Sequence, residues 1–253
     1  MLRPRIIPCL LVHRGGLVKT VKFGSPKYVG DPLNAVRIFN EKEVDELIVL
    51  DIDATVEGRE PNYALIERLA AECRMPLSYG GGVKRVDQVE RIIELGVEKV
   101  ALGSAAVETP AAIDVMAKAV GSQSIVAVLD VKGSPPEVWV RNATKNTGRE
   151  PVALAREMEQ RGVGEIVLNS VDRDGTMSGY DLDLVGRVRS ATSVPLTALG
   201  GAGSLDDIRR LIASFGAIGA AAGSLFVFKG QYRAVLINYP TPAAKDGLIF
   251  NHA

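Results

Sequence analysis

The chain has 253 residues, with 30 basic and 30 acidic side chains and two histidines, so its formal net charge near neutral pH is zero. This balance excludes an overall electrostatic attraction to nucleic acid or to an anionic membrane. No apolar run reaches the roughly 18 residues of a membrane span, and the amino terminus lacks the continuous apolar segment of a secretion signal. Two cysteines and two histidines provide neither a disulfide framework nor a metal-binding cluster. We therefore expect a cytoplasmic protein without a metal or other cofactor and without nucleic-acid or membrane partners.

Short apolar runs recur along the chain, and each is typical of a buried β-strand. In chain order they cover residues 5–11, 45–51, 76–79, 98–103, 124–130, 165–170, 195–199 and 217–222. The runs are apolar throughout rather than alternating, as in parallel strands that are covered on both faces by helices. Helical patterns with one apolar stripe separate them. With a length close to the roughly 250 residues typical of the fold, this order predicts a single (β/α)8 barrel over residues 1–240. A tail with no clear pattern follows at 241–253.

The chain also resembles itself. Residues 45–104 are echoed in step by residues 164–224. Such internal similarity predicts two half-barrels, at about residues 1–120 and 121–240. In this alignment Leu11 falls opposite Asp130, so the carboxylate at the end of the fifth predicted strand has no counterpart at the end of the first.

Two long segments, residues 13–32 and 132–148, interrupt the alternation of strands and helices. Long loops inside a compact barrel are usually functional. In barrels of this type the chemistry lies where the strands end and lead into helices, which is where both segments begin. Pro8 lies within the first predicted strand and removes a backbone donor there, which conflicts with a strand at that position.

Glycine-rich turns follow the third, fourth, seventh and eighth predicted strands. They are Gly80–Gly82, Gly103–Ser104, Gly200–Gly203 and Gly223–Ser224. Glycine lets backbone amides approach a phosphate closely, and serine adds a hydroxyl donor. Because the turns form two adjacent pairs related by the repeat, they predict two phosphate sites on opposite sides of one mouth. The alternative is that the glycines only permit tight turns between strands and helices.

Several short motifs recur in one order with family-like spacing. They are Arg5–Leu10, Lys19, Gly30–Pro32, Asp45–Leu47, Leu50–Ile52, Gly80–Gly82, Asn146–Gly148, Asp172–Thr176, Ser178–Asp181 and Gly200–Gly203. Together they make residues 3–228 resemble the cyclase subunit of imidazole glycerol phosphate synthase. The resemblance implies a (β/α)8 barrel that takes ammonia from a glutaminase partner. It further implies that this ammonia is used to cleave and cyclise a bisphosphorylated ribonucleotide of the histidine pathway.

The resemblance also implies roles for individual residues. Asp130 would be one of two acid/base aspartates. Polar side chains at the mouth and the glycine turns would hold the phosphorylated substrate; they are Lys19, Asp51, Asp172, Asp174, Thr176, Gly81, Gly82, Gly103, Ser104, Gly200, Gly201, Gly203, Gly223 and Ser224. A charged ring at the opposite face would admit ammonia from the glutaminase; its members are Arg5, Glu46, Lys99 and Glu165.

The position of these four charged residues supports a ring independently of the resemblance. Each stands at or just before the start of a predicted strand, so all four should lie at the amino-terminal end of the barrel, two positive and two negative. A salt-bridged plug that seals the barrel would use the same arrangement. Buried ion pairs stabilise poorly compared with apolar packing, so the ring also invites a gating hypothesis.

Leu11 departs from the family, which carries its other aspartate at this position. A positioned acid or base is worth about 10² to 10⁴ in rate, and leucine cannot transfer a proton. We therefore expect the ancestral ring closure to be slow unless His13 or Lys19, in the segment that follows, substitutes for the missing acid.

Four functions remain open. We favour a divergent paralogue of the cyclase: an ammonia-using subunit of a glutamine amidotransferase complex that acts on a phosphorylated acceptor and serves amidation of surface-polysaccharide sugars. The ordinary histidine-biosynthesis cyclase is one alternative. A non-catalytic barrel that activates the glutaminase and conducts ammonia to a third, acceptor enzyme is another. The related sugar isomerase ranks last, because its chemistry also needs two carboxylates.

Overall fold

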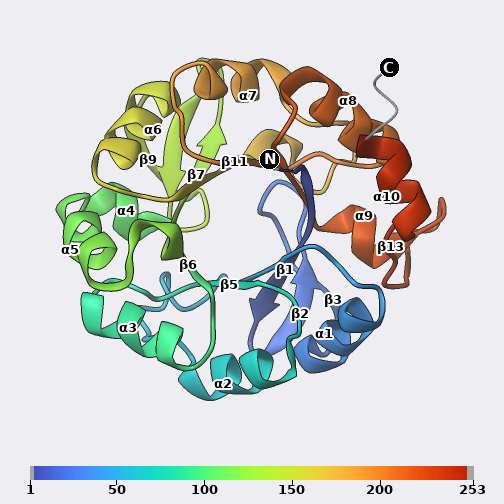
Figure 1. The fold of residues 1–253 in the computed structure, drawn as a ribbon, viewed down its shortest axis with the longest axis horizontal. Helices are drawn as coiled ribbons and strands as arrows, with labels where there is room; N and C mark the ends of the chain where they lie inside the picture. Colours follow the sequence, from blue (N-terminus) through green and yellow to red (C-terminus); the bar gives the residue numbers. More distant parts are fainter. Residues whose placement is uncertain (1–2, 250–253) are drawn as a thin grey trace.

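The computed structural model describes residues 3–249, and a closed barrel of parallel strands lies at its centre (Figure 1). Going round the barrel, the strands are β1 (Arg5–His13), β4 (Leu47–Asp51), β5 (Leu77–Gly80), β6 (Lys99–Leu102), β7 (Ile125–Lys132), β10 (Glu165–Ser170), β11 (Leu196–Leu199) and β12 (Gly219–Ala222). Each strand pairs in parallel with both neighbours, and β12 pairs with β1 to close the ring. The predicted (β/α)8 barrel is confirmed.

Helices form an outer layer around the strands (Figure 1). They are α1 (Pro32–Glu41), α2 (Tyr63–Glu72), α3 (Val86–Glu94), α4 (Ser104–Glu108), α5 (Ala111–Val120), α6 (Pro151–Gln160), α7 (Leu182–Arg189), α8 (Leu205–Phe215), α9 (Ser224–Val227) and α10 (Pro242–Ile249), with short 3-10 turns η1 (Ser122–Ser124) and η2 (Val171–Arg173). Local sequence starts several of them. Asp31 caps α1 ahead of a proline in the first turn, and Ser204 and Asp207 form a capping box at α8.

Apolar side chains fill both faces of the strands, which explains why the predicted strands read as continuous apolar runs. One face of each strand packs against the helices in a large outer core. The other face fills the inside of the barrel, where the buried cluster consists of Ile7, Cys9, Ile48, Ala101, Val126, Val128, Val167, Leu199 and Ala221. Leu11 and Leu50 pack against this inner cluster. The middle of the barrel interior is therefore lined with apolar side chains.

The two long segments after β1 and β7 contain antiparallel strands, where the sequence pattern predicts irregular loops. These strands are β2 (Gly16–Lys19) and β3 (Lys27–Gly30) after β1, and β8 (Glu137–Val140) and β9 (Lys145–Arg149) after β7. β1 turns directly into β2 at Arg14 and Gly15, which both have positive φ. The sequence does not reveal these strands because each is short and β3 and β9 are largely solvent-facing, so no apolar alternation marks them.

The remaining features concern the start and the end of the chain. Pro8 lies within β1 at the last position that pairs with β12, and the pairing of β1 with β4 begins at Cys9, so the missing donor falls between the two ladders. Short strands β13 (Phe228–Lys229) and β14 (Ala234–Val235) follow α9. Part of the predicted tail forms α10, which lies beside α8 (Figure 1); residues 250–253 lie outside the described residues. No helix within 3–249 is long and apolar enough to cross a bilayer. The half-barrel repeat and the domain limits stay predictions.

Candidate active site

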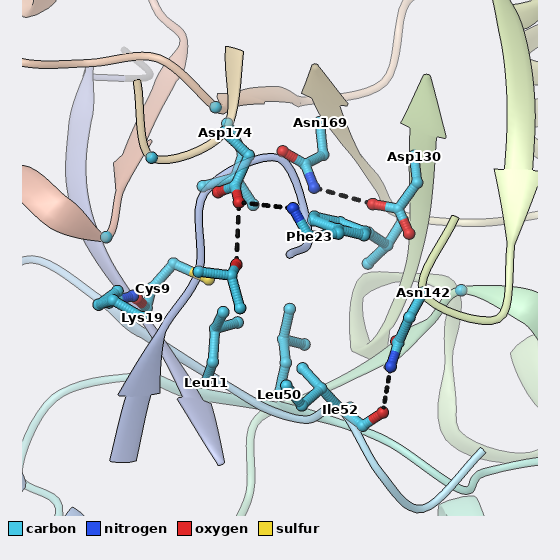
Figure 2. Close-up of a pocket in the computed structure, with 18 of the residues that line it drawn as sticks. Cys9, Leu11, Lys19, Phe23, Leu50, Ile52, Asp130, Asn142, Asn169 and Asp174 are labelled. Carbon is cyan, nitrogen blue, oxygen red and sulfur yellow. Dashed lines mark hydrogen bonds between the residues drawn. The ribbon is translucent and has the colours of Figure 1, made fainter. Parts of the chain in front are cut away.

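A cavity of about 320 Å³ opens where the barrel strands end, a volume within the range of small-molecule sites. Strand ends, the turns that follow them and both hairpins contribute to its walls (Figure 2). Among the predicted site residues, it brings together Leu11, Lys19, Asp51, Gly81, Gly103, Ser104, Asp130, Asp174, Gly200, Gly201, Gly223 and Ser224. Residues far apart in the sequence thus border one space.

Four predicted residues do not line this cavity. Their polar groups are bonded within the protein: Gly82 N donates to Thr55 Oγ1 at 3.1 Å, Gly203 N to Asp207 Oδ2 at 3.0 Å and Gly133 N to Asp172 Oδ2 at 2.8 Å, while the Thr176 hydroxyl lies 2.7 Å from that of Ser178. These contacts hold the turns in shape. A role of these four residues in ligand binding stays a prediction.

Asp130 is a carboxylate in the cavity wall at the end of β7. Asn169 Nδ2, on the neighbouring strand β10, donates to Asp130 Oδ1 at 2.8 Å (Figure 2). Burial raises the pKa of Asp130 to about 7, the hydrogen bond from Asn169 opposes the rise, and the negative charge of Asp174 adds to it. Near neutral pH the carboxyl group can therefore either hold or release a proton, as acid/base catalysis requires. Asn169 Oδ1 is buried and has no hydrogen-bond partner among the described residues.

Leu11 faces the cavity. Figure 2 shows it beside Leu50, opposite the side of the cavity that carries Asp130, Asn169 and Asp174. Both leucines line the cavity and continue the hydrocarbon of the inner barrel cluster. One wall of the mouth is therefore apolar, and proton transfer is confined to the polar groups around it.

Lys19 brings a buried cation to the side of the cavity near β12. The residue is only 6% exposed, and its ammonium donates to the carbonyl of Cys9. Burial lowers the pKa of Lys19, whereas the negative charge of nearby Asp174 favours the charged form. Asp174 is itself held by the Thr20 hydroxyl at 3.0 Å, and burial raises its pKa. A Cβ atom at Gly223 would overlap the Lys19 ammonium, so glycine at that position leaves room for the cation.

A histidine–aspartate pair stands at the rim. His13 Nδ1 lies 2.7 Å from Asp53 Oδ1, and the amide of Arg14 donates to Asp53 Oδ2 at 2.7 Å. Side chains two apart on a strand share a face, so His13 follows Leu11 on the inner face of β1, nearer the mouth. Both line the cavity. The sequence singled out His13 as a candidate for proton transfer but not its partner Asp53.

The β8–β9 hairpin reaches across the mouth. Asn142 Nδ2 donates to the carbonyl of Ile52 at 2.7 Å, on the loop after β4 (Figure 2). The amide of Arg141 donates to Ser104 Oγ at 3.0 Å, and its guanidinium pairs with Glu108 at 3.1 Å. The segment after β7 therefore borders the site, as expected, but no motif in the sequence pointed to Asn142 or Arg141.

The four charged residues at the opposite end of the barrel form a closed ring of ion pairs. Arg5 pairs with Glu46 and, through Nη2 at 2.8 Å, with Glu165; Lys99 Nζ lies 2.9 Å from a carboxylate oxygen of each glutamate. Burial would raise the pKa of Glu165, but Arg5 and Lys99 hold it below its ordinary value. Each buried carboxylate is shared by two cations, so the charges cancel around the ring. Its geometry suits both a plug and a gate.

Comparison with known proteins identifies relatives of this chain. A family model described as "Histidine biosynthesis protein" matches residues 5–233. The chain is 57% identical over 252 residues to a protein of Leptospira borgpetersenii provisionally named imidazole glycerol phosphate synthase subunit HisF, covering 98% of this chain and 99% of the relative. It is 57% identical over 249 residues to the provisionally named subunit hisF3 of Vibrio vulnificus, covering 97% and 96%. It is 43% identical over 230 residues to imidazole glycerol phosphate synthase subunit HisF of Hyphomonas neptunium, covering 90% and 91%.

The chain belongs to the HisF family. The resemblance found in the sequence is thereby confirmed. The family match begins at Arg5, at the start of β1, and ends at Arg233, ahead of α10. It therefore takes in the HisF-type barrel with both hairpins, the cavity at the mouth and the ring at the base. Among residues 3–249, no group of three or more His, Cys, Asp or Glu side chains is placed to hold a metal ion.

Proposed function

We propose that the chain is the ammonia-using subunit of a glutamine amidotransferase complex, of the cyclase type named in its relatives, and acts on a phosphorylated acceptor. We further propose that it is a divergent paralogue serving amidation of a surface-polysaccharide sugar. The observation that carries the divergence is Leu11, a hydrocarbon side chain in the cavity wall where the resembled cyclase has an acid. The name hisF3 of the Vibrio vulnificus relative is in keeping with additional family members in one genome.

A glutaminase bound at the base of the barrel would deliver ammonia through the ring. Neutral ammonia crosses hydrocarbon far more readily than ammonium does, because burying an unpaired charge is costly. The apolar inner cluster between the ring and Leu11 suits such passage. Opening the ring requires one cation to leave its two glutamates. Lys99, which is on a flexible four-carbon stem and makes its contacts at 2.9 Å, is the candidate for that movement.

The two pairs of glycine turns support binding of a ligand with two phosphates. β5 and β6 are neighbours in the barrel, as are β11 and β12, and two strands separate the pairs on either side. The alternative that glycine serves only tight packing fits Gly81, where a Cβ would overlap Asp51. It does not fit Gly103, where an added Cβ would meet no heavy atom of the described residues within 4 Å. The space beside Gly103 suits an approaching phosphate oxygen.

Proton transfer at this site would use the polar groups that remain around Leu11. Addition of ammonia to an electrophilic carbon leaves an extra proton on nitrogen. It also leaves a negative charge on the atom that receives the displaced electron pair. His13 Nε2 can take the nitrogen proton while Asp53 stabilises the resulting imidazolium through Nδ1. Asp130, with a pKa of about 7, can supply the other proton from its acid form. The two transfers balance, and neither needs an acid at position 11.

A non-catalytic conduit is the second candidate function. The observation that favours it is the continuity of hydrocarbon from the inner cluster to Leu11 and Leu50 at the mouth, which would deliver ammonia to another enzyme without reacting it. The ordinary histidine-biosynthesis cyclase would require the pair of His13 and Asp53 to replace the missing acid.

Activity with ammonium salts separates these functions. The purified chain is assayed with the bisphosphorylated ribonucleotide that the cyclase uses, beside an aspartate-bearing HisF protein. We expect a rate lower by about 10² or more, a gain in Leu11→Asp, and no gain in the matched variant Leu11→Asn, which adds a polar group without an acid. A normal rate in the unmodified chain would refute divergence. Stimulation of a glutaminase without turnover of any phosphorylated acceptor would favour the conduit.

A further inference from the structure

A second cavity, of about 180 Å³, adjoins the first on the β12 side. It lies between the β2–β3 hairpin and the segment after α9, and its lining consists of Lys19, Thr20, Val21, Ser25, Lys27, Ser224, Phe228 and Arg233. Lys19, Thr20 and Ser224 line both cavities. A ligand group held at Ser224 therefore stands at the entrance to the second space.

The second cavity is lined by cations and by no carboxylate; Asp174, whose charge acts on Lys19, lines only the first cavity. Lys19, Lys27 and Arg233 line it, and no Asp or Glu does so. Lys27 Nζ lies 5.2 Å and Arg233 Cζ lies 5.5 Å from the ring centroid of Phe228. Within the described part of the chain, neither the Lys27 ammonium nor the Arg233 guanidinium has a carboxylate within 4.0 Å. The guanidinium of Arg233 donates to the carbonyl of Gly175, at 2.7 Å. Two cations held beside one aromatic ring repel each other, and an anion between them would remove that cost.

The remaining polar groups suit a phosphate. Ser25 and Ser224 bring hydroxyl groups to the cavity, and neither hydroxyl is engaged in a hydrogen bond with the residues that the structure describes. Guanidinium groups bind phosphate oxygens through paired donors, and lysine adds a point charge. Water alone can solvate the charge of Lys27, because that residue is exposed. The charge of Arg233 is less accessible to water, because Arg233 is half-buried and directed at the ring of Phe228.

We propose that the second cavity binds the outer phosphate of a diphosphate whose inner phosphate lies at Gly223 and Ser224. The acceptor would then belong to the diphosphate esters, the class that includes nucleotide-linked sugars, rather than carrying a lone monophosphate on this side. This inference rests on the phosphate site of the proposed function, and it names the chemical class that the site selects.

Titration calorimetry with inorganic phosphate and inorganic pyrophosphate, at one pH and ionic strength, tests it. We expect the unmodified chain to bind pyrophosphate at least about tenfold more tightly than phosphate, the gain from one charge-assisted contact. Arg233→Gln and Lys27→Gln should each remove most of that preference and leave phosphate affinity within about twofold. Arg233→Lys, which keeps the charge, should retain part of it. Lys229→Gln is the matched control, because Lys229 follows Phe228 but lines neither cavity.

The outcomes distinguish the two proposals. If phosphate binds and Ser224→Ala weakens it, but pyrophosphate binds no more tightly, the phosphate site stands and the diphosphate inference is wrong. The diphosphate inference is also wrong if Lys229→Gln reduces the pyrophosphate preference as much as the two cavity variants do. If neither anion binds, the phosphate site of the proposed function fails, and the inference fails with it.

Discussion

Replacing Asp130 by asparagine should stabilise the protein above neutral pH and change its stability little near pH 4. In the folded protein, burial raises the pKa of Asp130 to about 7, whereas the pKa in an unfolded chain is about 3.9. Between these values the folded state binds more protons than the unfolded state, so the free energy of unfolding falls as pH rises. Asparagine keeps the shape of the side chain and never ionises, so the variant should escape this loss.

The size of the effect follows from the difference between the two pKa values. A difference of about three units corresponds to about 4 kcal/mol, since one unit is worth about 1.4 kcal/mol. That value is an upper limit, because Asp130 borders a cavity in which water can solvate the charged carboxylate. We expect a gain of about 1 to 3 kcal/mol at pH 8.5, which builds up between about pH 4 and pH 7 and is constant above.

Urea unfolding of both proteins at intervals from pH 4 to pH 8.5 measures this gain. Leu11→Asn serves as the control, because it adds an amide to the same cavity without removing a titrating group; its difference from the parent should not vary with pH. If the difference between Asp130→Asn and the parent is also independent of pH, Asp130 ionises as an ordinary carboxyl group. It could not then hold a proton at neutral pH, and the assigned acid role would be lost.

Other variants test the ring, the glycine turns and the cover of the mouth. Glu46→Gln leaves two partly buried cations with one buried carboxylate and should lower the free energy of unfolding in urea by about 3 kcal/mol; a loss no larger than that of the exposed control Glu98→Gln would argue against a tightly coupled ring. Gly103→Ala should leave thermal stability unchanged, because its Cβ meets open space, yet weaken phosphate binding about tenfold in calorimetry; unchanged binding would favour a purely structural turn. Asn142→Ala should lower the free energy of unfolding by about 1 kcal/mol and speed amide hydrogen exchange in β8–β9. Unchanged exchange would show that the hydrogen bond from Asn142 to Ile52 does not hold the hairpin closed.

The barrel strands could be predicted from the sequence because both faces of each strand are buried. Continuous apolar runs therefore mark them, and the predicted limits differ from the observed ones by only a few residues at each end. The hairpin strands lack that signal. β3 has no fully buried residue and β9 is polar along its length, so they depend on pairing with a neighbour that only the fold supplies.

The candidate site was predictable only where its residues carry a chemical pattern of their own. Asp130 stands alone at a strand end, and the glycine turns repeat, so both could be read from the sequence. Asn169, Asp53 and Asn142 could not, because each matters through one partner from a different strand or loop. An amide or carboxylate of this kind has no local signature until the barrel brings its partner within hydrogen-bond distance.

The inner face of β1 connects these observations. Side chains two apart on this strand share that face, so the charge at Arg5 is followed by apolar side chains at Ile7, Cys9 and Leu11 and then by His13 at the rim. Moving a proton-transfer group from position 11 to position 13 shifts it outward by about 6 to 7 Å. Such a shift exceeds the tolerance of acid/base catalysis, which needs hydrogen-bond reach of the reacting atom. If His13 is the working base, the acceptor must place its reacting atom nearer the mouth than the cyclase substrate does. Restoring an acid at position 11 would then revive the old reaction without improving the new one.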